Sequence, residues 1–121
     1  MATVELTNQN FAESVSGDGI TIVDFWAEWC GPCRMFGPIF EEASEKHPDI
    51  SFGKVNTEEQ RELADQAGIS SIPTLMVFRE NVLLYNRPGA LPGQGLEELI
   101  AAVRDLDMVK VHEKIAAEAA E

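Results

Sequence analysis

The chain has 121 residues, 21 acidic and 9 Lys or Arg, and a formal net charge of −12. That length suits one domain with its own hydrophobic core. The negative charge argues against nucleic-acid binding, which needs a basic face, and no apolar stretch approaches the ~18 residues of a membrane-spanning helix.

Apolar periodicity and turn residues predict alternating strands and helices along the chain. Strands are expected at residues 3–6, 20–27, 50–56, 74–78 and 83–86, and helices at residues 10–15, 32–46, 57–67 and around 96–103. Thr57 and Gln60 suggest a capping box, Gly68 a helix end, and Asn81 a tight hairpin turn. This order predicts an α/β fold: a central mixed β-sheet flanked by helices on both faces.

The chain divides into a domain at residues 1–106 and an acidic, Ala/Glu-rich C-terminal extension at residues 107–121. Met108, Val111 and Ile115 have helical spacing in the extension, but so short an isolated helix is marginal in water. Docking on the domain, pairing with another chain and fraying all remain open. We expect a monomer with a frayed helical extension, which is also the candidate element for self-association.

The two cysteines of the chain, Cys30 and Cys33, lie where an apolar strand gives way to a helix. A disulfide closing so short a loop adds little stability, whereas two thiols at this spacing suit two-electron exchange. Unpaired N–H groups at a helix start favour a thiolate at Cys30. Cys33, one turn into the helix, is expected to be more buried.

Zinc binding is the competing chemical use of such a pair, and structural zinc needs four ligands. His47 lies at the far end of the same helix, roughly 21 Å from Cys33 at 1.5 Å per residue, and His112 lies in the extension. We therefore expect no metal. The N-terminal residues lack a basic region followed by an apolar run, so we expect no secretory signal and a reducing, cytoplasmic location.

Three segments together resemble the thioredoxin family: residues 23–34 its active-site segment, residues 72–75 its cis-proline segment, and residues 89–90 the glycine turn that follows. The resemblance covers about residues 3–106. It implies the thioredoxin fold and a protein-disulfide reductase that acts on disulfide-containing proteins. No bound cofactor is implied beyond a redox-active Cys30–Cys33 disulfide, which thioredoxin reductase would reduce again with NADPH.

The resemblance also implies roles for individual residues. Cys30 would be the nucleophile and Cys33 the resolving thiol, and Asp24 would take the proton of Cys33. Burial in an apolar strand should raise the pKa of Asp24, and Lys54 matches the family's lysine near that aspartate. A cis Ile72–Pro73 bond would face the disulfide. The expected apolar docking surface comprises Trp29, Gly31, Pro32, Ile72, Pro73, Gly89 and Ala90.

Two other functions compete with a reductase. Oxidases and isomerases of the same fold usually carry a histidine between the cysteines, and Gly31-Pro32 argues against them. A redox-dependent binding module would draw its best support from the extension. Pro88 stands where the family usually has a β-branched residue, and it leaves the choice of substrates open. Trp26 is expected in the core or packed behind the site residues, rather than in contact with substrate.

Overall fold

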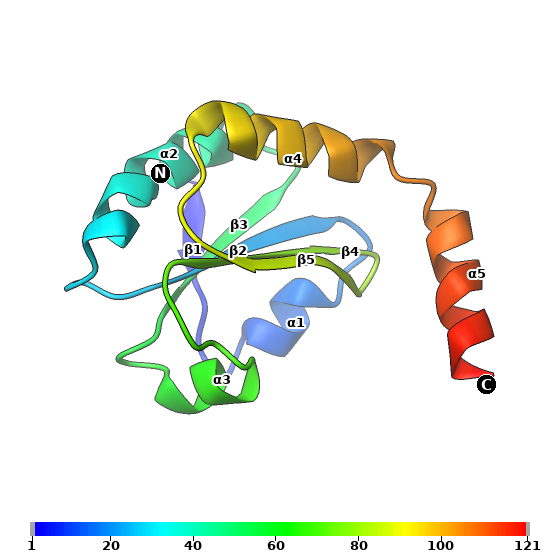
Figure 1. The fold of residues 1–121 in the computed structure, drawn as a ribbon, viewed down its shortest axis with the longest axis horizontal. Helices are drawn as coiled ribbons and strands as arrows, with labels where there is room; N and C mark the ends of the chain where they lie inside the picture. The colour runs from blue at the N-terminus through cyan, green and yellow to red at the C-terminus, as the bar shows by residue number, and fades with distance from the viewer. Residues whose placement is uncertain (1, 121) are drawn as a thin grey trace.

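The computed structural model describes residues 2–120, which form a five-stranded sheet covered by helices on both faces (Figure 1). The strand order is β1-β3-β2-β4-β5, with β2 in the centre. β2 runs parallel to β3, β3 parallel to β1, and the β4–β5 hairpin joins β2 in the antiparallel direction. The strands are β1 (Thr3–Glu5), β2 (Ile20–Trp26), β3 (Ser51–Asn56), β4 (Thr74–Arg79) and β5 (Val82–Pro88). The predicted mixed sheet is therefore confirmed.

Two helices cover each face of the sheet (Figure 1). α2 (Gly31–Lys46) and α4 (Gly93–Asp105) lie on one face, and α1 (Phe11–Val15) and α3 (Arg61–Gln66) on the other. The fifth helix, α5 (Met108–Ala119), follows α4 and projects from the end of the molecule. Within residues 2–120, no helix combines the length and apolar character that a bilayer crossing requires.

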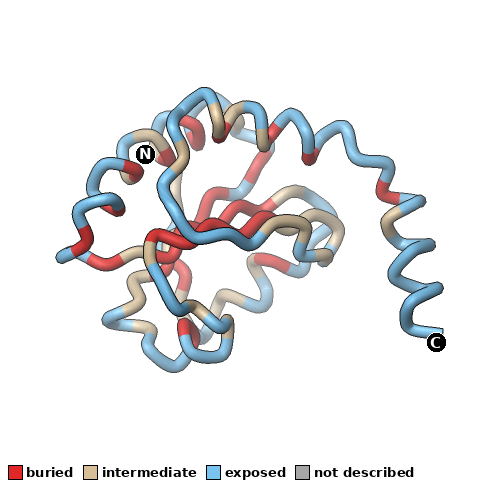
Figure 2. Tube along the Cα trace, in the orientation of Figure 1, coloured by how far each residue is buried: buried red, intermediate tan, exposed pale blue. Residues whose placement is uncertain are grey.

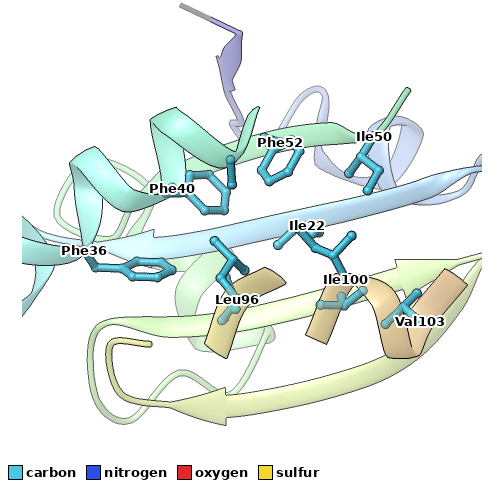
Figure 3. Close-up of a cluster of buried hydrophobic side chains, with 11 residues drawn as sticks. Ile22, Phe36, Phe40, Ile50, Phe52, Leu96, Ile100 and Val103 are labelled. Atoms are coloured by element: carbon cyan, nitrogen blue, oxygen red, sulfur yellow. The ribbon is translucent and has the colours of Figure 1, made fainter. Parts of the chain in front are cut away.

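The two faces of the central strand supply two separate cores. Successive side chains of a strand point to opposite faces, so Ile22 packs with α2 and α4 while Val23 packs with α1 and α3. In the first core, the rings of Phe40 and Phe52 meet edge to face with centroids 5.2 Å apart (Figure 3). Buried residues lie along the middle strands and recur along α2 and α4 (Figure 2). A strand buried on both faces explains its nearly continuous apolar sequence.

The β4–β5 turn and the end of α3 form as their residues predict. Glu80 and Asn81 have φ of 52° and 62°, the left-handed pair required by a two-residue hairpin turn. Gly68 has φ of 72°, and its N–H donates to Asp65, while the N–H of Ile69 donates to Ala64. These two bonds form a Schellman motif that satisfies the last carbonyls of α3.

The predicted capping box at the start of α3 is wrong. The helix begins at Arg61, and Gln60 occupies the cap position. Thr57 instead donates from its N–H and its hydroxyl to the carbonyl of Trp26, at 2.9 and 3.0 Å. The Gln60 side chain accepts from the N–H of Asn8 at 3.1 Å. Both side chains are taken by partners distant in sequence, which a local motif cannot anticipate.

The extension forms a complete helix, whereas its small apolar content favoured a frayed one. Asp107 caps α5 by accepting from the N–H groups of Val109 and Lys110, and Met108 is buried. His112 lies 3.0 Å from a carboxylate oxygen of Glu80 in the hairpin turn. The cap and these two contacts hold the first turns of α5, while Ile115 farther along is 43% exposed.

Candidate functional site

The cysteine pair sits at the junction of β2 and α2. Cys30 is the N-cap of α2, with extended backbone at φ −85° and ψ 114°, and Pro32 lies in the first turn. The N–H of Cys33 donates to the sulfur of Cys30 at 3.2 Å, and the two residues form a disulfide. One N–H group at the start of the helix thus points at the Cys30 sulfur, where it favours negative charge on reduction. The predicted position of Cys30 at the start of the helix is confirmed, while its preference for a thiolate stays a prediction.

The two cysteines are equally buried, each 4% exposed, so the expected difference in burial is wrong. Cys30 packs with Ala27, Cys33 and Ile72 in a small cluster at the end of the sheet. The exposed surface beside it belongs to its neighbours: Trp29 is 66% exposed, and Gly31 and Pro32 are exposed. A partner that docks on this surface would exclude water around the sulfur.

A second loop, between α3 and β4, closes against the disulfide. The Ile72–Pro73 peptide bond is cis, as the resemblance implied. The Ile72 carbonyl oxygen lies 3.8 Å from the Cys30 sulfur. The Pro73 carbonyl in turn accepts from the N–H of Gly89 at 2.7 Å, which ties in the loop that follows β5. Gly89 has φ of 109°, a conformation that favours glycine.

These contacts gather the residues expected to form the docking surface at one end of the sheet. Trp29, Gly31 and Pro32 come from the β2–α2 junction, and Ile72 and Pro73 from the loop before β4. Gly89 is bonded to Pro73, and Ala90 follows it in the chain. The first two segments meet at Cys30, because β2 and β4 are neighbours in the sheet, and the Gly89–Pro73 bond joins the third segment to them.

Asp24 lies inside β2 and is 1% exposed. Neither of its carboxylate oxygens has a hydrogen-bond partner among residues 2–120. Burial raises the pKa of Asp24 to about 7, and the positive charge of Lys54 opposes that rise. A carboxyl that titrates near neutral pH is suited to proton transfer.

Lys54 is the Cα partner of Asp24 across the β2–β3 pair. Its amino nitrogen lies 5.0 Å from the centroid of the Trp26 ring, in a cation–π contact. Trp26 is half-buried and packs against the cysteine cluster, which places it beside the site and not in the main cores.

Within residues 2–120, no group of three or more His, Cys, Asp or Glu side chains is arranged to hold a metal ion. His47 is engaged elsewhere: its Nε2 lies 2.7 Å from Glu97, and its Nδ1 lies 3.1 Å from the Arg104 guanidinium. Because arginine can only donate, Nδ1 accepts and Nε2 carries the proton. His47 therefore joins the end of α2 to α4.

The sequence analysis missed a groove beside the disulfide. It has a volume of about 630 Å³ and runs from Trp29 and Ile72 toward α3. No local motif marks it, because it forms between loops that meet only in the folded chain. The remaining lining residues are Thr57, Glu58, Arg61, Ala64, Asp65, Ile69, Ser70 and Ser71.

Comparison with known proteins identifies the family. The family model described as Thioredoxin matches residues 2–102. The chain belongs to the thioredoxin family. It is 52% identical to a putative thioredoxin 2 of Streptomyces coelicolor over 99% of this chain and 90% of that protein. It is 44% identical to a thioredoxin of Alicyclobacillus acidocaldarius over 84% of this chain and 98% of that protein.

A solved structure shows the same thioredoxin fold. The thioredoxin of Malassezia sympodialis, Mala s 13, is 32% identical, with a TM-score of 0.75 over 84% of this chain and 93% of that one. As a thioredoxin family member, the chain is an oxidoreductase of disulfides. Its Cys30–Cys33 pair occupies the position that performs dithiol–disulfide exchange.

Proposed function

We propose that the protein is a general protein-disulfide reductase, recharged by thioredoxin reductase with electrons from NADPH. The observation that carries this proposal is the placement of Cys30: its sulfur caps α2, accepts the N–H of Cys33, and lies beside the exposed Trp29. A thiolate there is stabilised before a substrate arrives, and an apolar surface stands ready to receive the substrate.

In the first step, the Cys30 thiolate attacks one sulfur of a substrate disulfide. A Cys30–substrate bond forms, the substrate S–S bond breaks, and the second substrate sulfur leaves as a thiolate that takes up a proton. The docking surface holds the substrate in this step through Trp29, Gly31, Pro32, Ile72, Pro73, Gly89 and Ala90. The groove toward α3 extends that surface to residues flanking the substrate cysteine.

In the second step, Cys33 resolves the mixed disulfide. Asp24 accepts the Cys33 proton, and the new thiolate attacks the Cys30 sulfur and expels the remaining substrate thiolate. Two electrons have then passed from the protein dithiol to the substrate, and Cys30–Cys33 is again a disulfide. Lys54 tunes Asp24 so that its carboxyl accepts a proton near neutral pH.

A reductase role also implies a cellular compartment for the protein and a division of the chain into a catalytic domain and an appendage. A dithiol donor requires a reducing compartment, so we place the protein in the cytoplasm. The reductase domain is residues 1–106, which act as a monomer, and residues 107–121 are an appendage to it.

Insulin reduction driven by NADPH and thioredoxin reductase tests this function. Wild-type protein should turn over repeatedly, and Cys30→Ser and Cys33→Ser should not. On the reduced protein, trace iodoacetamide should alkylate Cys30 before Cys33. Failure of thioredoxin reductase to reduce the wild-type disulfide, or a redox couple more oxidising than glutathione, would reject a reductase.

A further inference from the structure

Three residues of the site share one face of the sheet. Asp24 and Trp26 are two residues apart on β2, so their side chains point to the same side, which is the side that α2 covers. Lys54 stands opposite Asp24 on the adjacent strand β3. Lys54 can therefore direct its amino group toward the carboxyl of Asp24 or toward the ring of Trp26.

In the structure, the Lys54 amino group lies over the Trp26 ring. The Lys54 nitrogen lies 5.0 Å from the Trp26 centroid, while both oxygens of Asp24 lack a hydrogen-bond partner among residues 2–120. A lysine side chain is long and flexible, and a buried carboxylate would ordinarily attract it into a direct bond. The indole face supplies a competing site for the same charge.

Among residues 2–120, no charged group other than Lys54 acts on Asp24. On β4, the residue opposite Asp24 is Leu75, and α2 and α4 contribute apolar side chains to that face of the sheet. At this end of α2, the two cysteines do not ionise as a disulfide, and Arg34 in the first turn is exposed to solvent. Lys54 is the charged group that acts on Asp24.

We propose that Trp26 is a positioning residue: its ring holds the Lys54 ammonium close enough to act on Asp24 through space but keeps it from bonding that carboxyl. A direct bond would keep Asp24 ionised and weaken it as a proton acceptor, and a lysine released into solvent would act on it less. The catalytic meaning of this inference rests on the proposed function, in which Asp24 takes the Cys33 proton.

The test is a double-mutant cycle read on Asp24 itself. The pKa of its carboxyl is measured by NMR in the oxidised protein, for wild type, Trp26→Leu, Lys54→Met and the double variant. Trp26 also packs against the cysteine cluster, so its removal changes water access by itself, and the cycle cancels that direct effect. In the wild-type background, Lys54→Met should raise the Asp24 pKa by about one unit. In the Trp26→Leu background, it should raise that pKa by less than half as much.

Two further variants sharpen the result. Trp26→Phe keeps a smaller aromatic face and should retain part of the coupling, and it gives the decisive cycle if Trp26→Leu fails to fold. Trp29→Leu is the matched control, since Trp29 is the other tryptophan but is 66% exposed. In the Trp29→Leu background, Lys54→Met should raise the Asp24 pKa as much as it does in the wild-type background.

An equal effect of Lys54→Met with and without the Trp26 ring would overturn the proposal. The pH dependence of mixed-disulfide resolution separates it from the proposed function. If Trp26 and Lys54 are coupled but the pH midpoint of resolution does not follow the Asp24 pKa across the variants, the positioning by Trp26 stands and the role of Asp24 as proton acceptor fails.

Discussion

Two aspartates at opposite ends of the molecule have pKa values shifted in opposite directions. At the disulfide end, Asp24 is buried with no hydrogen-bond partner among the described residues, and burial raises its pKa to about 7. At the end that carries α5, Asp49 is exposed and accepts two bonds from Arg104, at 2.7 and 3.1 Å, which lower its pKa to about 2. The same residue type is thus a weak acid at one end and, at the other, a carboxylate that is ionised at neutral pH.

The difference extends to the groups around each aspartate. Near α5, polar groups find partners: Arg79 donates to three carbonyls at the end of α4, and Asp107 caps the next helix. Near the disulfide, the Asp24 carboxyl has no hydrogen-bond partner in the part of the chain that the structure describes, and Trp29 is exposed to solvent. A buried carboxyl without a hydrogen bond costs stability, so its place beside the disulfide is consistent with a role for Asp24 in the chemistry there.

The largest expected effect separates the two cysteines at the disulfide end. Cys33→Ser should trap substrates as mixed disulfides through Cys30, because no thiol remains to resolve them. A non-reducing gel should show adducts that disappear with dithiothreitol. Cys30→Ser is the matched control and should show none. Adducts no more abundant than in wild type would contradict the two-step mechanism.

Next, Asp24→Ala should slow resolution by about 10²-fold and leave the attack by Cys30 unchanged. Single-turnover kinetics with a fluorescent disulfide distinguish the two steps. Asp24→Asn should slow resolution similarly, because it too cannot accept the proton. Unchanged resolution would remove Asp24 from the mechanism.

The same substitution should change how stability depends on pH. The folded pKa of Asp24, about 7, exceeds its ordinary value of 3.8, so between these values the folded state binds more protons than the unfolded state. Wild-type stability therefore falls as pH rises through this range. The stability of Asp24→Ala relative to wild type should grow by up to about 4 kcal/mol between pH 4 and pH 7. Urea unfolding measures it, and a constant difference would contradict the raised pKa.

At the other end, Arg79→Ala should lower the free energy of unfolding by about 2 kcal/mol, because its charged donor satisfies the last carbonyls of α4. Insulin reduction should stay at the wild-type level. Arg87→Ala, at an exposed position on β5, should cost less than about 0.5 kcal/mol. Equal losses for the two arginines would show that the capping bonds contribute nothing.

Removal of residues 107–121 should leave insulin reduction unchanged, because every residue assigned to the chemistry lies before position 91. Met108 is the buried apolar residue of α5, so the loss of stability should be about 1.5–3 kcal/mol at most, before the ordering cost of the helix is subtracted. Sedimentation of the full and shortened chains tests self-association through α5. A large loss of activity would show that α5 reaches the disulfide end.

The smallest effect is expected from Arg104→Ala. The pKa of Asp49 should return from about 2 toward the ordinary aspartate value of 3.8, as measured by NMR titration. A lowered pKa contributes stability that is present above the unfolded value and is lost as pH falls through the folded one. Asp49 should therefore stabilise the protein as pH rises from 2 to 4, opposite in sign to Asp24, and the reduction rate should not change.

Local patterns in the sequence determined the elements and the identity of the redox pair. The apolar run of β2, the left-handed Asn81 and the helix end at Gly68 each follow from the conformations that those residues prefer near their neighbours. The position of Cys30 and Cys33 at a strand–helix junction follows from the same change of periodicity. A strand buried on both faces also indicated that Asp24 would be buried.

The tertiary structure alone decided which distant groups meet. The register of β2 against β3 places Lys54 opposite Asp24. The Thr57 hydroxyl, predicted to cap α3, instead donates to the Trp26 carbonyl. The Gly89–Pro73 bond and the groove toward α3 also join segments far apart in the chain. Periodicity reports how a segment folds against its immediate neighbours, whereas register and non-local hydrogen bonds depend on the whole packed sheet, and the proton-transfer environment of the site arises there.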